Sequence, residues 1–173
     1  DYAGGDQYVG SWLDGKRDGQ GTLTHVSDGG GKYEGGYKQD RRHGHGIYTH
    51  STGANYDGGW ENDMMHGKGV SHFSNGDKYT GDYVEDNKHG KGVFTCANTD
   101  RYAGEYKNDL RHGKGVTTTH LNDRYVGEYQ YGKRHGKGLQ TWGRGEKYDG
   151  MWKADKRHGY GVFWGLDGSK YDG

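Results

Sequence analysis

The sequence predicts an all-β protein, an elongated single-layer twisted antiparallel sheet of tandem β-hairpins. Three observations lead to this prediction: a 23-residue repeat, aromatic residues that alternate with polar ones, and glycines in fixed columns. The 173 residues include 37 glycines, 16 tyrosines and no proline, and only 28% are hydrophobic. Such a chain has too few aliphatic residues to fill the core of an ordinary layered enzyme.

Each repeat begins with a tyrosine, and a second aromatic residue follows four positions later. The starting tyrosines are separated by 25 residues once and by 23 thereafter, so about seven repeats start near 8, 33, 56, 79, 102, 125 and 148, with a truncated eighth at 171. Because both ends lie inside a repeat, we interpret residues 1–173 as one array excerpted from a longer one. The two columns form the predicted structural aromatic ladder: Tyr8, Trp12, Tyr33, Tyr37, Tyr56, Trp60, Tyr79, Tyr83, Tyr102, Tyr106, Tyr125, Tyr129, Tyr148 and Trp152.

The spacing within a repeat predicts one β-hairpin per repeat. The tyrosine, a glycine two positions later and the second aromatic residue share one strand face, because successive side chains alternate. We expect the rings to lie over the bare backbone of glycines in a neighbouring strand. An aromatic side chain buries about 150–250 Å². The two columns can therefore supply the apolar burial that aliphatic residues provide in other folds.

Glycine, Asn and Asp mark the predicted turns. A Gly-x-Gly pair follows each starting tyrosine by eleven and thirteen positions, and we interpret it as a bend. A second turn, such as Asn75-Gly76-Asp77, separates successive repeats. Thr99 and Asn122 replace the glycine of this turn, so its geometry is expected to differ there. The two extra residues of the first repeat fall around Gly29–Gly31.

The pattern Tyr-x-Gly-x-Trp/Tyr, followed by Gly-x-Gly, an aliphatic residue and a turn, resembles the MORN (membrane occupation and recognition nexus) repeat. The resemblance covers essentially the whole chain. It implies a non-enzymatic structural scaffold or protein-interaction module. Within the family, segments such as Arg42-His43-Gly44-His45-Gly46 look most like those of radial spoke head proteins, which implies an axonemal role in motile cilia.

Two other functions in the family stay open. The repeats of junctophilins associate with the plasma membrane, which implies a phospholipid-associated tether as an alternative. MORN repeats also occur beside SET-domain lysine methyltransferases and plant phosphatidylinositol phosphate kinases. That occurrence implies a third alternative, the targeting module of a larger enzyme whose catalytic domain lies outside this chain.

A column of basic residues, most of them followed by histidine, is the candidate contact site for a partner or a lipid. We expect it at an exposed edge, at the hairpin tips or just past them. Aspartates two positions before most of these cations compensate the charge, which favours a solvated edge over a lipid site. The candidate residues are Arg42, His43, Lys88, His89, Arg111, His112, Arg134, His135, Arg157 and His158, and the aspartates are Asp40, Asp63, Asp86, Asp109 and Asp155.

The histidine column does not predict a metal site. Equivalent residues of successive hairpins are about 10 Å apart, whereas zinc ligands lie within about 4 Å of each other. We interpret these histidines as turn residues that hydrogen-bond to the backbone. The sequence contains no P-loop, dinucleotide-binding or nucleophile-elbow motif, so no catalytic, metal-binding or cofactor-binding residue is predicted and no enzymatic activity is expected.

The net charge and the targeting signals of the sequence limit the classes of partner and the cellular locations that we expect. The 24 basic and 24 acidic side chains cancel, which gives no general attraction to nucleic acid. No signal peptide or apolar membrane span is recognisable, which predicts an intracellular protein. The resemblance to radial spoke head proteins implies a location in the cytoplasm or cytoskeleton, including the cilium axoneme. We expect protein partners: a helix docked in an aromatic-lined trough, another repeat protein, or a second copy paired at an open sheet edge. Phospholipid is the less favoured partner.

Overall fold

The computed structural model describes residues 5–25 and 30–173. These residues form fifteen β-strands and contain no helix, which confirms the predicted all-β fold of antiparallel hairpins. The chain divides into two compact units, Asp1–Asn87 and Lys88–Gly173, each of which is described separately. Gly29, where the sequence placed part of the two-residue insertion, lies outside the described residues.

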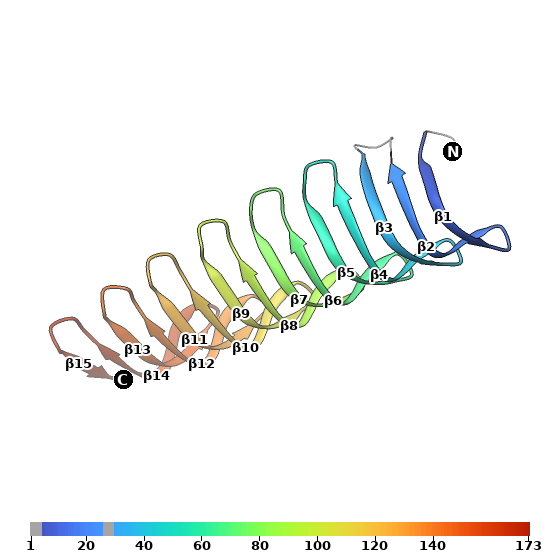
Figure 1. The fold of residues 1–173 in the computed structure, drawn as a ribbon. Coiled ribbons are helices and arrows are strands. Elements are labelled where there is room, and N and C mark those ends of the chain that lie inside the picture. Colours follow the sequence, from blue (N-terminus) through green and yellow to red (C-terminus); the bar gives the residue numbers. More distant parts are fainter. Residues whose placement is uncertain (1–4, 26–29) are drawn as a thin grey trace. The chain divides into compact units, whose positions relative to one another are not determined.

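In the first unit, each strand pairs antiparallel with the next strand of the chain, so the strand order follows the sequence (Figure 1). The described part of this sheet is a single layer. Its strands are β1 (Gln7–Leu13), β2 (Lys16–His25), β3 (Gly31–Lys38), β4 (Arg41–His50), β5 (Asn55–Glu61), β6 (Met64–His72) and β7 (Lys78–Val84).

The second unit repeats this arrangement, with antiparallel pairs between consecutive strands. Its first strand begins at the unit boundary. The strands are β8 (Asn87–Thr95), β9 (Arg101–Lys107), β10 (Leu110–Thr118), β11 (Arg124–Gln130), β12 (Lys133–Thr141), β13 (Lys147–Lys153), β14 (Lys156–Trp164) and β15 (Lys170–Asp172).

Two-residue turns join the two strands of each hairpin, and we call this end the hairpin tip. Both turn residues have positive φ, as at Asn62 (51°) and Asp63 (71°). This is the type I′ geometry, whose twist matches that of the flanking strands. Asn and Asp tolerate the left-handed region better than most residues, which explains their frequency at the tips.

The loops between repeats share one backbone hydrogen bond. The Gly76 N–H donates to the Phe73 carbonyl at 3.0 Å, and the N–H groups of Thr99 and Asn122 make the equivalent bond at 2.9 Å. The expectation that Thr99 and Asn122 alter this turn was wrong, because a backbone bond that needs no particular side chain closes it. Both residues instead adopt positive φ, 73° and 64°.

We expect Thr99→Gly to stabilise the protein by about 0.5–1 kcal/mol. A β-branched side chain in the left-handed region costs about 1–2 kcal/mol, which exceeds the entropic cost of introducing glycine. Asn122→Gly is the matched control and should change the free energy of unfolding by less than about 0.5 kcal/mol, since Asn tolerates this region. Urea unfolding measures both, and a destabilised Thr99→Gly would contradict the strain argument.

The Gly-x-Gly pairs lie within strands and form β-bulges, which corrects their interpretation as bends. In the β5–β6 hairpin, Gly58 pairs with Gly69 and Trp60 pairs with Met65, so one residue of β5 faces three residues of β6. Gly67, the first glycine of its pair, has φ of 75° at this bulge. The left-handed backbone explains the need for glycine there.

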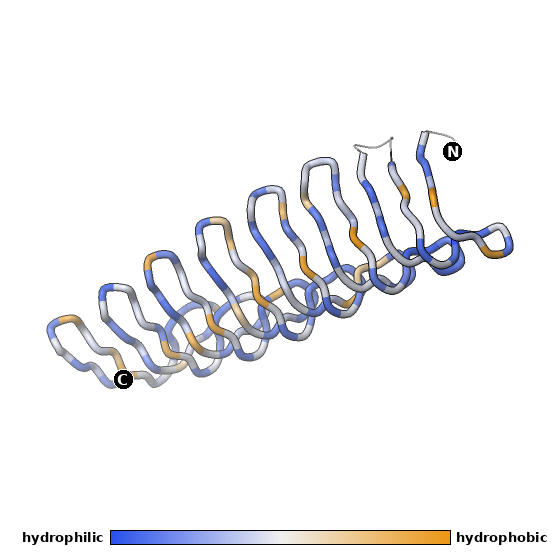
Figure 2. The backbone as a smooth tube through the Cα atoms, viewed as in Figure 1, coloured by the Kyte–Doolittle hydropathy of each residue, from blue (hydrophilic) through white to orange (hydrophobic). Residues whose placement is uncertain are grey.

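Aromatic rings provide the buried apolar surface of both units. All the buried hydrophobic residues among those described are Tyr or Trp of the two aromatic columns. Along the tube of Figure 2 the hydrophobic positions are short and isolated. The burial therefore comes from amphipathic rings rather than from a continuous aliphatic core.

Candidate interaction surface

The two aromatic columns lie on one face of the sheet in each unit, which we call the ring face. From the second repeat onward their twelve members, Tyr33 to Trp152, are buried with at most 6% of their surface exposed. In the first repeat Trp12 is 52% exposed. The buried rings are packed against one another and present little free surface for stacking on a ligand.

Edge-to-face contacts run continuously along the ring face of each unit. The ring of Tyr33 meets Tyr37 of its own repeat at 5.2 Å between centroids and Trp60 of the next repeat at 5.3 Å, with interplanar angles of 88° and 86°. The same two contacts recur in the second unit. Each such pair contributes about 0.5–1.5 kcal/mol beyond its burial. The starting tyrosines therefore link each repeat to the next within a unit, at Tyr8, Tyr33 and Tyr56 in the first unit and at Tyr102 and Tyr125 in the second.

Each starting tyrosine also lies against glycines of its own hairpin. A Cβ atom added at Gly35 or Gly46 would come within 2.6 Å or less of the Tyr33 hydroxyl oxygen. The Tyr33 hydroxyl donates a hydrogen bond to the Gly36 carbonyl at 3.0 Å, beside the bulge. The glycine columns are thus required by the close approach of the ring, and the hydroxyl satisfies a backbone acceptor where the ladder is interrupted.

The second aromatic residue carries a polar atom that also needs a partner. The Trp60 indole N–H donates to the Gly46 carbonyl at 3.0 Å, and the hydroxyls of Tyr83 and Ser71 are 2.6 Å apart. The Tyr37 hydroxyl oxygen is buried and has no hydrogen-bond partner among the described residues. This column therefore accommodates Trp or Tyr: Trp60 and Tyr83 find a polar group in the preceding repeat, whereas Tyr37 is buried without one.

The basic column lies over the ring face. The Arg42 guanidinium carbon is 4.1 Å from the centroid of a Trp60 ring, and that of Arg134 is 4.2 Å from Trp152. Only 28% of each arginine side chain is exposed. The sequence placed these cations at an exposed edge, but their stems and guanidinium groups are largely covered because they pack on aromatic faces.

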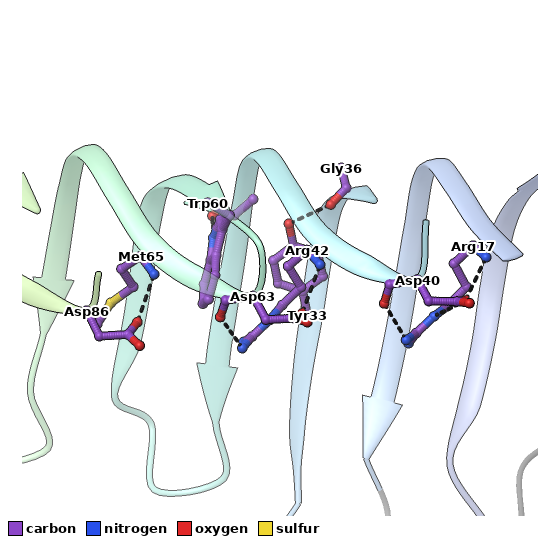
Figure 3. A network of polar contacts seen from close by, with 10 residues as sticks. Arg17, Tyr33, Gly36, Asp40, Arg42, Trp60, Asp63, Met65 and Asp86 are labelled. Carbon is purple, nitrogen blue, oxygen red and sulfur yellow. Dashed lines mark hydrogen bonds and ion pairs between the residues drawn. The ribbon is translucent and has the colours of Figure 1, made fainter. Parts of the chain in front are cut away.

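An aspartate at each of several tips binds the basic column of the preceding repeat, and we call this contact the aspartate clamp. Asp63 accepts the Arg42 backbone N–H at 2.9 Å, while its own N–H donates to the Arg42 carbonyl at 3.1 Å. The Arg42 side chain contacts the same carboxylate at 3.3 Å (Figure 3). Asp40 and Arg17 form the same clamp, in which the Arg17 backbone N–H lowers the pKa of Asp40.

The clamp differs from the charge compensation expected from the sequence. The aspartates were expected to compensate the charge of cations two positions later, in their own turns. Asp63 instead holds Arg42, which precedes it by 21 residues. Met65, which occupies the basic column after Asp63, keeps the backbone part of the clamp with Asp86 at 2.8 Å (Figure 3). The aspartates therefore join repeats together as well as compensating charge.

Carboxylates also join repeats at the end opposite the tips. Asp100 accepts the backbone N–H of His120 at 2.8 Å, and the His120 ring nitrogen Nδ1 lies at the same distance. The backbone hydrogen bond lowers the pKa of Asp100. Asp123 accepts the Gly143 N–H of the following loop in the same way. Both ends of the hairpins in the second unit are thus tied to their neighbours.

The face opposite the rings carries an aliphatic surface in the second unit that the sequence analysis did not identify. Its members lie directly opposite one another on the five adjacent strands β8 to β12, and all are partly exposed. The sequence does show an aliphatic residue after most Gly-x-Gly pairs. Only the strand register shows that this residue lies opposite the residue that follows a starting tyrosine. We call this set the aliphatic row: Val93, Ala103, Val116, Val126 and Leu139.

Charged residues of alternating sign flank the aliphatic row. Lys91 lies opposite Glu105, and Lys114 lies opposite Glu128. In the first unit polar residues interrupt the equivalent positions, so no continuous row forms there. Those positions are Val9, Thr22, Glu34, Ile47, Asp57, Val70 and Thr80.

The sequence profile of the MORN repeat matches seven segments of the chain, residues 8–29, 33–54, 56–78, 79–101, 102–119, 125–147 and 148–170. These segments cover most of the sequence. The chain belongs to the MORN-repeat family. The MORN repeat is in general a non-catalytic module for protein interaction and scaffolding.

Among solved structures, the MORN array is similar to the TCP domain of SAS-4 (dCPAP) of Drosophila melanogaster in complex with a proline-rich motif of Ana2 (dSTIL). The two chains are 9% identical with a TM-score of 0.54, and the match covers 97% of this chain and 88% of that one. At this identity the similarity shows a shared fold alone. A comparison with curated proteins gave no match. None of the described residues forms a helix long and apolar enough to cross a membrane.

The histidine column of the MORN array lies within strands, which corrects its assignment to turns. The reason is that the type I′ tips end before the histidines, which lie in the bulges or directly beside them. His66 lies 3.6 Å from Glu61, and the His112 ring meets Tyr131 edge-on at 6.1 Å. No group of three or more potential metal ligands occurs in the described part of the chain. The column consists of His43, His66, His89, His112, His135 and His158, on β4, β6, β8, β10, β12 and β14.

We expect the MORN array to lose stability as the pH rises above about 10, the pKa of an unfolded tyrosine. Burial raises the pKa of Tyr37 to about 12 and raises the pKa values of Tyr33, Tyr56 and Tyr102 as well. Because the folded pKa values exceed the unfolded ones, the unfolded state releases protons first and the free energy of unfolding falls with pH. Tyrosinate absorbance should therefore rise together with the loss of β-sheet circular dichroism, and complete ionisation of a folded protein would contradict this expectation.

Proposed function

We propose that this MORN array is a non-enzymatic scaffold that docks a protein partner on the aliphatic row. The row is the observation that supports the proposal, since an exposed apolar strip rimmed by polar residues is typical of interaction sites. The ring face is a weaker candidate because its rings and clamped arginines already contact one another. One face of an amphipathic helix would complement the row, and the alternating Lys and Glu residues favour a partner that carries charges of both signs.

The shared fold gives further support for docking of a segment. The TCP domain of SAS-4 is in complex with a proline-rich motif, so a similar fold accommodates a short segment of another protein. For the MORN array we favour an apolar stripe over a proline-rich segment. The reason is that aliphatic side chains line the row, whereas proline-rich segments usually dock in grooves lined by aromatic residues.

A crosslinking experiment tests this proposal. A photoreactive amino acid at Val126, in the aliphatic row, should crosslink a protein partner in cells, and the same amino acid at Thr80, at an equivalent position of the first unit, should not. Val116→Asp should reduce the crosslink at Val126 at least ten-fold, whereas Thr80→Asp should leave it unchanged. Unfolding midpoints of both variants separate lost docking from lost folding, and equal crosslinking at Val126 and Thr80 would contradict the proposal.

The finer assignment is an axonemal component of motile cilia, within the cytoskeleton. It is supported by the resemblance of the Arg/Lys-His-Gly-x-Gly segments to those of radial spoke head proteins. Fluorescent tagging in ciliated cells tests it, because an axonemal protein stays with detergent-extracted axonemes.

A homodimer through sheet edges is a further expectation, and sedimentation at several protein concentrations tests it. The targeting module of an enzyme would instead appear wherever its catalytic domain acts.

We expect little binding to anionic vesicles at physiological salt. Each exposed cation near an anionic membrane contributes about 1 kcal/mol, but Arg17, Arg42, Lys88 and Arg134 are half-buried and contact a carboxylate. Liposome cosedimentation with vesicles that contain phosphatidylserine or phosphatidylinositol bisphosphate measures this binding. Strong binding that falls steeply with salt would favour the phospholipid tether over the protein scaffold.

A further inference from the structure

One tip of the second unit lacks the aspartate of the clamp. Gly132 occupies the position at which other tips carry Asp40, Asp63, Asp86, Asp109 or Asp155. Gly132 adopts the same positive φ (81°), and its N–H donates to the Arg111 carbonyl at 2.9 Å. The backbone half of the clamp is therefore kept, while the carboxylate half is missing.

The backbone N–H and the guanidinium of Arg111 lack the carboxylate that the equivalent arginines of other repeats bind. In the clamps of Arg42 and Arg134, the backbone N–H and the guanidinium both contact one aspartate, at distances of 2.9–3.3 Å. Arg111 stacks 5.0 Å from the Tyr102 ring centroid, and no described residue forms an ion pair with it. Its guanidinium packs against the ring and has no carboxylate within ion-pair distance among the described residues.

A hollow of about 410 Å³ surrounds this position and includes Arg111, Gly132, Thr117 and Tyr129 among its lining residues. Its other charged groups are already engaged. Asp155 pairs with Arg134 at 3.2 Å, and Asp123 accepts the Gly143 N–H at 2.8 Å. A Cβ atom added at Gly132 would meet only Leu110, at 3.9 Å, so the carboxylate position is sterically open.

The geometry points to Arg111 and Gly132 as a binding site for the carboxylate of an acidic side chain on a protein partner. Arginine with a neighbouring backbone N–H presents parallel donors that match a carboxylate. The clamps elsewhere in the chain show that an aspartate side chain fits this arrangement. The site lies on the ring face, away from the aliphatic row, and it goes beyond the proposed docking function. Either one can therefore fail without the other.

An NMR titration of the isotope-labelled chain tests the site. The probe is N-acetyl-aspartate methylamide, and the neutral control is N-acetyl-asparagine methylamide at matched ionic strength. The Arg111 backbone N–H and side-chain Nε–H resonances should shift saturably with the aspartate probe, at least ten times more than with the asparagine probe. In Gly132→Asp the protein's own carboxylate should occupy the position, abolish the response at Arg111 and raise the Tm.

A second variant moves the site to another repeat. Asp63→Gly should open the same position beside Arg42 and create a saturable response of the Arg42 N–H to the aspartate probe, while the response at Arg111 persists. Equal responses to the two probes, or a response at Arg111 that survives Gly132→Asp, would overturn the site. Inorganic phosphate that binds Arg111 as tightly as the aspartate probe would also overturn it, because the site would then be a general anion site.

Discussion

Replacing Trp60 with alanine is expected to lower the free energy of unfolding by about 3–5 kcal/mol, as for other buried large aromatic residues. Trp60 is 6% exposed and meets Tyr33 and Tyr56 edge-to-face at 5.3 and 5.2 Å. Its indole N–H bonds the Gly46 carbonyl, and Arg42 stacks 4.1 Å from a ring centroid. Alanine removes all of these contacts and leaves a cavity between two repeats.

Trp12→Ala is the matched control, because Trp12 occupies the same column but is 52% exposed. We expect it to cost less than about 1 kcal/mol. Urea unfolding of both variants gives the comparison. Since repeats unfold partly independently, hydrogen exchange of the amides in β4 to β6 should also accelerate in Trp60→Ala. A cost below about 1 kcal/mol for Trp60→Ala would show that the ring ladder does not carry the stability.

Adding one methyl group at Gly46 is expected to cost at least about 2 kcal/mol, within the range of overpacked cores. The added Cβ would lie 2.2 Å from the Tyr33 hydroxyl oxygen and 2.5 Å from its Cζ atom. Tyr33 is fully buried between Tyr37 and Trp60, so its ring has no room to move. In an unconstrained strand the same change would stabilise, since alanine reduces the entropy of the unfolded chain.

A double-mutant cycle isolates this clash. Tyr33→Ala removes the ring, so the additional cost of Gly46→Ala in that background should fall below about 0.5 kcal/mol. Equilibrium unfolding of the two single variants and the double variant measures the coupling. If Gly46→Ala costs the same with and without the Tyr33 ring, then the ring is not the reason for the glycine column.

The sequence could assign the two aromatic columns to one strand face because the rule behind this assignment is local. Side chains two and four positions apart share a strand face, so Tyr56, Gly58 and Trp60 could be assigned to one surface without any structure. The prediction failed at the bulges. The Gly-x-Gly pair of Gly67 and Gly69 has the composition of a turn, and only the register with β5 places it within a strand.

Surfaces to which several repeats contribute could not be predicted from the sequence alone. The aliphatic row joins Val116 on β10 with Val126 on β11 and Ala103 on β9, and each pairing depends on the strand register, which a bulge shifts between β9 and β10. The candidate cations were expected at an exposed edge, whereas the arginines lie over the ring face. Arg42 packs on Trp60 of the following repeat, a neighbour that the spacing of basic residues does not encode.

The sequence by itself determined the repeat length, the all-β fold and the residues of the ring face, because strand alternation acts over a few neighbouring positions. Only the tertiary structure decided which aspartate meets which arginine. Asp63 holds Arg42 from the repeat before it, 21 residues away, since successive hairpins lie side by side and their tips meet. The same packing of neighbouring hairpins explains the effect of Gly132. Glycine is an ordinary residue in a turn, but here it leaves Arg111 without a carboxylate, because β10 and β11 are adjacent.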